Sequence, residues 1–358
     1  MIMNHVYWQV GEVKTASKMK ALHLAGGDLS KIKFYYYDEI LNNKNFENEP
    51  PESFEQLAIE RCIFLRNTAN HLVLWLSSGY DSNTVLHYFI KSGCKIDEIV
   101  CYTRDKIFDS EYNTSLKVAI SYKKTHNQKC KINWFRLQLE SLEDYYQNLK
   151  DDFIYQPGQN LRFSKTDPTS QLHSHYEIRK FLEVNANTRL DIFGTEKPKL
   201  LIEEGKWYTA MPDNNFYYFY SDAITSFFND APYFKIFAKQ AHMALKWFES
   251  LPEFDEALLS KVQSYDQEYY NRWNVACGRV PVINKFSVNG WSKHLYFNDY
   301  ITSIDSLPYV QFYQNSKIMK YYKTAINDFK SFFKLNDLKN LPNLQIMGLK
   351  KFLKNVKK

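Results

Sequence analysis

Four short apolar runs that alternate with helical patterns constrain this chain most. The runs cover residues 71–76 (HLVLWL), 97–103 (DEIVCYT), 131–137 (KINWFRL) and 189–194 (RLDIFG). Apolar runs of this length are typical of strands that are buried on both faces of a parallel sheet. Helical spacing over 82–92, 110–124 and 168–184 lies between them. Strands alternating with helices predict right-handed crossovers and an α/β fold with a doubly wound parallel sheet.

The segments around this pattern predict further elements and three regions. Ser53 begins a capped helix that runs to about Thr68, and residues 199–211 form a hairpin that turns at Glu204-Gly205. Beyond about residue 214 the pattern is mainly helical and aromatic. We therefore expect an N-terminal extension over 1–54, a nucleotide-binding domain over 55–212 and a smaller, mainly helical C-terminal domain over 213–358. An apolar stripe at helical spacing predicts that the tail is a helix, and it consists of Ile346, Leu349, Leu353 and Val356.

Composition indicates an ordinary globular protein of 358 residues, with 44% hydrophobic and 24% charged residues. The five cysteines are scattered and form no CxxC pair, so neither a zinc framework nor a disulfide framework is expected. A reducing, cytoplasmic location fits this pattern best. The N-terminal residues lack the apolar run of a signal peptide, and no apolar stretch is long enough to span a membrane.

The net charge of +6 comes from the tail. Six of the 46 basic residues are lysines at or after Lys339, where no acidic residue occurs, so the rest of the chain has 40 basic and 40 acidic residues. A general nucleic-acid-binding surface is therefore not expected. The tail leaves contact with RNA or with an anionic membrane possible, whereas the alternative is a helix that docks on its own domain with the lysines in water. The oligomeric state cannot be deduced from the sequence.

The segment SSGYDS, residues 77–82, joins the first buried run to a helix. A helix N-terminus offers unpaired backbone N–H groups and a partial positive charge, which together favour phosphate. The hydroxyls of Ser77 and Ser82 add donors, and Asp81 has the ligand chemistry for Mg²⁺. The alternative is a plain strand-to-helix turn, because serine, glycine and aspartate are common turn residues.

SSGYDS resembles the SGGxDS pyrophosphate-binding motif of the PP-loop (N-type) ATP pyrophosphatases, most of all the synthetase domain of asparagine synthetase-like proteins. Ser77, Gly79, Asp81 and Ser82 match the motif, and Ser78 stands where the family has its first glycine. The resemblance covers roughly residues 55–200. A Walker A loop is excluded, because no GK[ST] follows the glycine.

The resemblance implies an AMP-forming ligase that uses ATP and Mg²⁺. Such an enzyme adenylates a carboxyl or carbonyl oxygen of a small-molecule acceptor, which an amine or another nucleophile then attacks. The implied nucleotide-binding residues are the loop itself, the end of the second strand and the glycine after the later strand: Ser77, Ser78, Gly79, Tyr80, Asp81, Ser82, Tyr102 and Gly194. Tyr102 would contact adenine through its backbone. No glutaminase domain is expected, because position 2 is not cysteine and the segment before the loop is short.

A second cluster, Gly194-Thr195-Glu196-Lys197-Pro198, follows the run RLDIFG. By resemblance to the family it lies near the phosphates. Glu196 is then a candidate Mg²⁺ ligand or a residue that orients the nucleophile, and Lys197 a candidate for neutralising the departing pyrophosphate. Asp191 is a weaker metal candidate. The alternative is a polar hairpin loop.

Other polar residues give weaker signals. His173 and Glu177 share a helix face while His175 does not, which favours a solvated helix over a metal site. The irregular segment NRWNVACGRVPVINK either borders the site and binds an anionic substrate or is a buried loop; its candidates are Arg272, Cys277, Gly278, Arg279 and Lys285. Cys277 has no identifiable histidine partner that would make it a nucleophile.

Three alternative functions remain open at this point. The first is a PP-loop enzyme that modifies tRNA or a nucleobase, which the basic tail would serve. The second is a relative of the sulfonucleotide reductases, disfavoured because the tail has no cysteine. The third is a non-catalytic nucleotide-binding or interaction protein.

Overall fold

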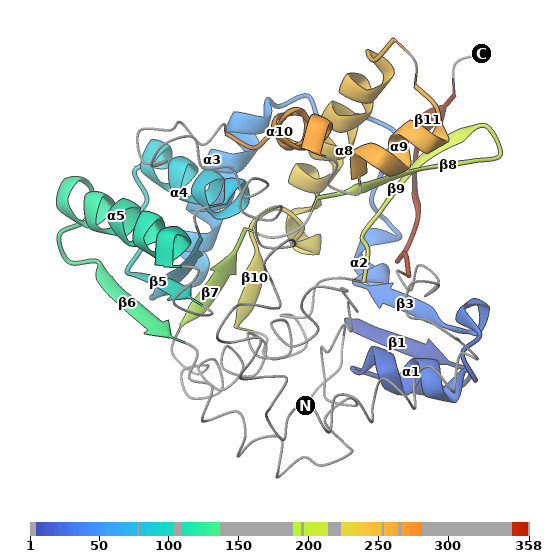
Figure 1. Cartoon of the computed structure of the whole chain (residues 1–358), viewed down its shortest axis with the longest axis horizontal. Helices are drawn as coiled ribbons and strands as arrows, with labels where there is room; N and C mark the ends of the chain where they lie inside the picture. Colours follow the sequence, from blue (N-terminus) through green and yellow to red (C-terminus); the bar gives the residue numbers. More distant parts are fainter. Residues whose placement is uncertain are drawn as a thin grey trace, which may run out of the picture.

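In the computed structural model, the described residues form three β-sheets with helices packed around them (Figure 1). It describes residues 5–77, 79–103, 109–136, 189–194, 197–213, 223–252, 254–263, 267–280 and 346–356. The predicted helix over 168–184 lies outside these residues. Within them, no helix is long and apolar enough to cross a membrane.

A five-stranded parallel sheet with helices forms the α/β part of the chain. Its order is β10-β7-β4-β5-β6, with bounds β4 (Leu72–Leu76), β5 (Glu98–Thr103), β6 (Lys131–Arg136), β7 (Leu190–Phe193) and β10 (Ile224–Ser226). β4 lies at the centre, and all five of its residues are buried, as the unbroken apolar run predicts. The four predicted strands are confirmed, and β10 is a fifth that the short segment ITS did not reveal.

Three helices pack with one face of this sheet: α3 (Phe54–Thr68), α4 (Tyr80–Ser92) and α5 (Asp109–Thr125). α3 begins as predicted, because Ser53 and Gln56 form a reciprocal capping box. α4 ends at Gly93, whose φ of 70° is the left-handed conformation expected of glycine there. Alternate residues of β4, Leu72, Leu74 and Leu76, join the core beneath the helices.

The strand order reverses beside β4. The chain runs outward through β5 and β6 on one side, then returns to place β7 on the other side of β4 and β10 beyond it. All these pairings are parallel, so the loops that follow β4 and β7 leave the same edge of the sheet side by side. Ligands of open parallel sheets bind at such a reversal, outside the carboxyl ends of the strands.

The N-terminal region forms a small antiparallel sheet of order β2-β1-β3. Its elements are β1 (Val6–Val10), β2 (Val13–Thr15), α1 (Lys18–Leu24), the 3₁₀ turn η1 (Leu29–Lys31), β3 (Lys33–Tyr36) and α2 (Asp38–Leu41). Figure 1 shows this blue region apart from the parallel sheet, on the side toward the hairpin described next.

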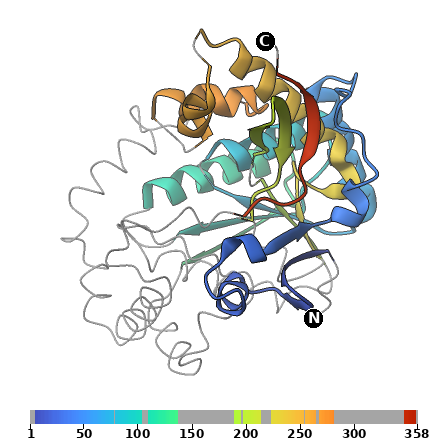
Figure 2. The same cartoon turned by 90° about the vertical axis from the view of Figure 1, so that its right-hand side faces the viewer.

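The third sheet is the predicted hairpin plus one strand from the tail. β8 (Lys199–Glu203) and β9 (Lys206–Ala210) join through Glu204 and Gly205, whose φ values of 49° and 71° suit a two-residue hairpin turn. β11 (Lys351–Asn355) pairs antiparallel with β9. Figures 1 and 2 both show the red β11 beside the hairpin.

The predicted helix in the tail is therefore wrong. The apolar residues have helical spacing, but the free edge of β9 offers backbone groups to which the tail bonds instead. A register irregularity between Phe352 and Lys354 leaves Leu353 fully buried in the core. Periodicity cannot reveal a partner strand so far away in sequence.

The region after residue 223 contains helices that match the predicted pattern: the 3₁₀ turn η5 (Ala231–Tyr233), α8 (Phe234–Glu249), α9 (Glu256–Gln263) and α10 (Gln267–Ala276). A helical C-terminal domain over 213–358 is nevertheless not confirmed. The same region supplies β10 to the parallel sheet and β11 to the hairpin sheet. The boundaries at residues 54 and 212 stay predictions.

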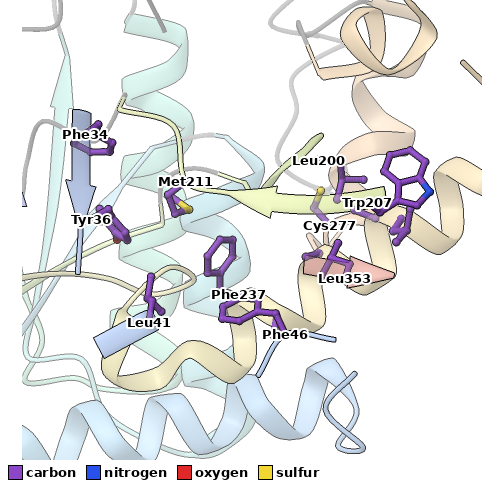
Figure 3. Close-up of a cluster of buried hydrophobic side chains, with 14 of the residues drawn as sticks. Phe34, Tyr36, Leu41, Phe46, Leu200, Trp207, Met211, Phe237, Cys277 and Leu353 are labelled. Carbon is purple, nitrogen blue, oxygen red and sulfur yellow. The ribbon is translucent and has the colours of Figure 1, made fainter. Parts of the chain in front are cut away.

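A second hydrophobic core joins segments from both ends of the chain. Figure 3 shows side chains of β3, the hairpin, α8 and β11 in this cluster, including Phe34, Tyr36, Leu200, Trp207, Phe237 and Leu353. Cys277, just after α10, belongs to it as well. The core that holds Trp273 and Cys277 in place therefore also contains side chains of the N-terminal sheet.

One buried ion pair stabilises this core, and we predict a large cost for breaking it. The Lys18 ammonium lies 2.6 Å from the Asp213 carboxylate, with side chains 3% and 0% exposed, and the Trp8 indole donates to the same carboxylate. Asp213→Ala leaves the lysine without its carboxylate and should lower the free energy of unfolding by about 3–5 kcal/mol. Urea denaturation measures this change.

Lys31→Ala is the matched control. Lys31 pairs with Asp28 at 3.5 Å, but both side chains are largely exposed, so its loss should cost no more than about 1 kcal/mol. Equal costs for the two variants would contradict the role assigned to the buried pair.

Candidate phosphate-binding site

The loop after β4 is closed by its own serines. The Ser82 hydroxyl accepts from the Ser77 amide at 2.9 Å and donates to the Ser77 carbonyl at 3.1 Å. The Ser77 hydroxyl accepts from the Gly79 amide at 3.2 Å. These bonds join Ser77, at the start of the loop, to Ser82 in the first turn of α4.

Asn83, which sequence reasoning missed, adds to this closure. Its side-chain amide donates to the carbonyls of Ser77 at 3.0 Å and Gly79 at 2.8 Å. Both carbonyls are thereby directed toward α4. The only signal in the sequence was a side-chain amide directly after the motif, which is too common to interpret.

The N-terminus of α4 has no side-chain cap. Gly79 is the N-cap residue, has an extended backbone and, without a side chain, makes no capping hydrogen bond. The first turn of a helix without such a cap presents donors and a partial positive charge to an anion. Ser77, Gly79, Tyr80, Asp81 and Ser82 therefore lie where the motif predicts, at the carboxyl end of the central strand.

The end of β7 packs directly against this loop. A Cβ on Gly194 would lie 2.7 Å from the Asp81 carbonyl oxygen and 2.9 Å from the Ser82 amide nitrogen. Contacts that short do not occur, so glycine is required for the two loops to approach. Gly194 therefore lies against the loop, and its contact with a nucleotide stays a prediction.

Lys197 reaches the same point from the segment after β7. Its side chain is 6% exposed, and its ammonium lies 3.1 Å and 3.3 Å from the two carboxylate oxygens of Asp81. A surface lysine on a hairpin loop would be solvated instead. The structure therefore brings together Asp81 and Lys197, which the sequence placed in separate clusters.

Arg279 is the third charged group of the site. Its Nε donates to Asp81, its Nη1 donates to the Cys277 carbonyl at 3.0 Å, and its guanidinium lies 3.5 Å from the centre of the Phe228 ring. The arginine side chain has no exposed surface. It was a weaker candidate in the irregular segment, and it now lies beside the loop.

α10 is attached to the same first turns of α4. The Tyr80 hydroxyl donates to the Asn271 side chain at 2.9 Å, and the Val280 amide donates to the Thr84 hydroxyl at 3.0 Å. With the Arg279–Asp81 contact, these bonds hold residues 271–280 against the loop. Neither Asn271 nor Thr84 was a sequence candidate.

Lys197, Arg279 and the N-terminus of α4 place positive charge around the Asp81 carboxylate. Burial alone would raise the pKa of the Asp81 carboxyl, but Lys197 and Arg279 outweigh it and hold that pKa below its usual value. Asp81 is therefore ionised at neutral pH, and the two cations beside it are of the kind that bind phosphate.

The described residues fit phosphate better than they fit Mg²⁺. Both Asp81 oxygens already contact cationic groups, which compete with a metal ion. No cluster of three or more metal-binding side chains exists in the described ranges. Glu196, the second predicted metal ligand, lies outside those ranges, so Mg²⁺ at Asp81 and Glu196 stays a prediction.

Several other candidates lie outside the described residues: Ser78, Glu196, His173, His175, Glu177 and Lys285. The backbone of Tyr102 is described at the end of β5, but its side chain is not. Its contact with adenine stays a prediction.

Three further candidates are described and lie in other surroundings. Cys277 is buried, and burial raises the pKa of its thiol to about 12, which disfavours a nucleophilic thiolate. Arg272 is exposed and lies over the Trp247 ring. Asp191 accepts from Trp75 and Arg189 within the sheet, so its carboxylate serves an internal network.

Three tail lysines bind partners inside the chain. Lys350 contacts Glu203, Lys354 contacts Glu249, and Lys351 donates to the carbonyls of Leu41 and Asn42. From the sequence alone, these lysines could have contacted RNA, but their ammonium groups already bind partners within the chain. A nucleic-acid contact through the tail stays a prediction with less support.

Comparisons with protein-family models, curated proteins and solved structures find no match for this chain. The functional argument therefore depends on the geometry of the site and on the resemblance of its motif.

The close contact between the two loops yields a prediction for Gly194→Ala. The new methyl group would meet backbone atoms of Asp81 and Ser82, which cannot rotate away. We expect the free energy of unfolding to fall by about 1–3 kcal/mol, the usual cost of overpacking. Urea denaturation tests this.

Gly348→Ala serves as its control, because a Cβ there would lie 3.3 Å from the Met211 carbonyl oxygen, a milder contact. If the Gly194→Ala protein were as stable as the control, the backbone after β7 would have moved to make room for the methyl group, and the prediction would be wrong.

Proposed function

We propose that this chain is an ATP-using enzyme of the PP-loop type that forms AMP and pyrophosphate. The observation that favours it most is the convergence of Asp81, Lys197 and Arg279 on the first turn of α4. The strand order supports a doubly wound arrangement, because the order reverses between β4 and β7. The residues predicted to bind phosphate follow these two strands.

In this proposal the β and γ phosphates of ATP bind the loop 77–82. Backbone amides of the loop and of α4 donate to the phosphate oxygens, and the serine bonds described above keep them in position. Lys197 lies beside the loop and stabilises the charge that grows on pyrophosphate as the α–β bond breaks.

The remaining steps follow from the resemblance. A carboxyl or carbonyl oxygen of a small-molecule acceptor attacks the α-phosphate, and an amine or other nucleophile then displaces AMP. Adenine would lie at the end of β5, near the backbone of Tyr102. Mg²⁺, if bound with ATP, would supply further charge neutralisation on the phosphates.

Product analysis tests the proposed reaction class. The protein is incubated with ATP, Mg²⁺, the proteinogenic amino acids and ammonium chloride, and nucleotides are separated by anion exchange. We expect AMP and pyrophosphate, because the site lacks a Walker lysine and resembles a pyrophosphate-binding loop. ADP as the main product would overturn the assignment, and ATP binding without turnover would favour the non-catalytic alternative.

Lys197→Met distinguishes a catalytic lysine from a structural one. If Lys197 neutralises the departing pyrophosphate, single-turnover pyrophosphate release should slow by about 10²–10³-fold. ATP affinity should change much less, because the backbone amides of the loop remain. Rapid-quench measurement of pyrophosphate, beside calorimetry with ATP, measures both quantities.

Lys199→Met is the matched control, two residues further along. Its ammonium donates to the Gln263 carbonyl at 2.8 Å, away from Asp81, so both quantities should stay near wild type. A Lys197→Met protein that releases pyrophosphate at full speed would exclude the proposed role.

A further inference from the structure

One stretch of the chain concentrates positive charge that other parts of the chain balance. Residues 112–136 contain five lysines and one arginine but no aspartate or glutamate. The stretch covers most of α5, the connection after it and all of β6. The equal numbers of basic and acidic residues outside the tail therefore hide a local excess of positive charge.

Four of these lysines surround the connection from α5 to β6, which lies at the left of Figure 1. Lys123 and Lys124 are in the last turn of α5, Lys129 is in the loop, and Lys131 is the first residue of β6. All four are exposed. Cations in the last turn of a helix are common, because they favour the negative end of its dipole. That explanation does not apply to Lys129 and Lys131, which lie outside the helix.

A fifth lysine reaches the same place from another part of the chain. The Lys131 amide donates to the Asp97 carbonyl at 2.8 Å, and the Asn127 side chain donates to the Ile96 carbonyl at 2.9 Å. These bonds hold the loop before β5, which carries the exposed Lys95, against the start of β6. We call the five lysines the basic patch: Lys95, Lys123, Lys124, Lys129 and Lys131.

The acidic residues that adjoin the basic patch bind other cations. Asp97 pairs with Arg66 at 2.6 Å, and the buried Glu98 lies 3.2 Å from Arg189 and 3.3 Å from His71. No lysine of the basic patch forms an ion pair within the part of the chain that the structure describes. Like charges gathered at one place repel each other, and a polyanion relieves this repulsion.

We propose that the basic patch binds the phosphate backbone of a nucleic acid. This inference goes beyond the proposed function and does not depend on it, because the patch is at the amino end of the sheet and the loop 77–82 at the carboxyl end. Lysines neutralise phosphates without reading bases, so binding should vary little with sequence and weaken steeply with salt. An anionic membrane suits the patch less, because residues 93–97 and 121–131 expose no large apolar side chain for insertion.

Fluorescence anisotropy of the full chain, without ATP, tests this inference. The probes are fluorescein-labelled single-stranded RNA and DNA of the same mixed sequence, about 20 nucleotides long, in KCl from about 50 mM upward. We expect a dissociation constant of about 10⁻⁶ M or lower at the lowest salt, and weaker binding as the salt concentration rises. Comparing the two probes tells which source of phosphate the patch prefers.

The double variant Lys124→Gln/Lys129→Gln removes two ammonium groups from the basic patch. Its affinity at low salt should fall about tenfold, and the slope of log affinity against log salt should become shallower by about 0.7 for each lysine. Lys124→Arg/Lys129→Arg keeps both charges and should bind like wild type. The matched control is Lys20→Gln/Lys33→Gln, which removes two exposed lysines from α1 and β3, on the other side of Figure 1.

Wild-type protein that binds neither RNA nor DNA at low salt would overturn the inference. A Lys124→Gln/Lys129→Gln protein that binds as tightly as the Lys20→Gln/Lys33→Gln control would do the same. Because ATP is absent, none of these results bears on the proposed function.

The membrane alternative has its own test. Sedimentation with vesicles of phosphatidylcholine and phosphatidylserine in equal parts measures lipid binding. The nearest apolar side chain that could insert is Ile120, which is 51% exposed and lies one turn before Lys124. Vesicle binding that Ile120→Ser abolishes, in a protein that does not bind nucleic acid, would assign the basic patch to a membrane surface instead.

Discussion

The Asp81 carboxylate, shared by two buried cations, is the interaction on which the site depends. It joins the loop after the central strand to Lys197, 116 residues later, and to Arg279, 198 residues later. Ionised groups with so little exposure are stable only when they are paired. Three segments meet at this carboxylate, and the packing of Gly194 against the loop and of Gly278 against Phe54 lets them do so.

Much of the α/β part could be predicted from the sequence because its signals are local. A buried run predicts β4, Ser53 and Gln56 predict the start of α3, and Gly93 predicts the end of α4. Each of these depends on residues within one or two turns of each other. The loop 77–82 was found for the same reason, since its strand, turn and helix are contiguous.

Contacts between segments that are far apart in the sequence could not be predicted. β11 was predicted as a helix because spacing says nothing about the free edge of β9. β10 has only three residues, too few for any period to be visible. The pairing of Arg279 with Asp81 could not be deduced either, because each residue has many possible partners in the sequence and only the fold brings these two together.

The second core explains how a distant segment is positioned so accurately. The Cys277 carbonyl accepts from Arg279 and also from the side chain of Gln240, which is fully buried on α8. α8 in turn packs in the core that contains the N-terminal strands and β11. Because one carbonyl receives both bonds, the position of the guanidinium is set by the packing of α8. The N-terminal sheet and the tail strand β11 thus contribute to the position of the site through the core that they share with α8.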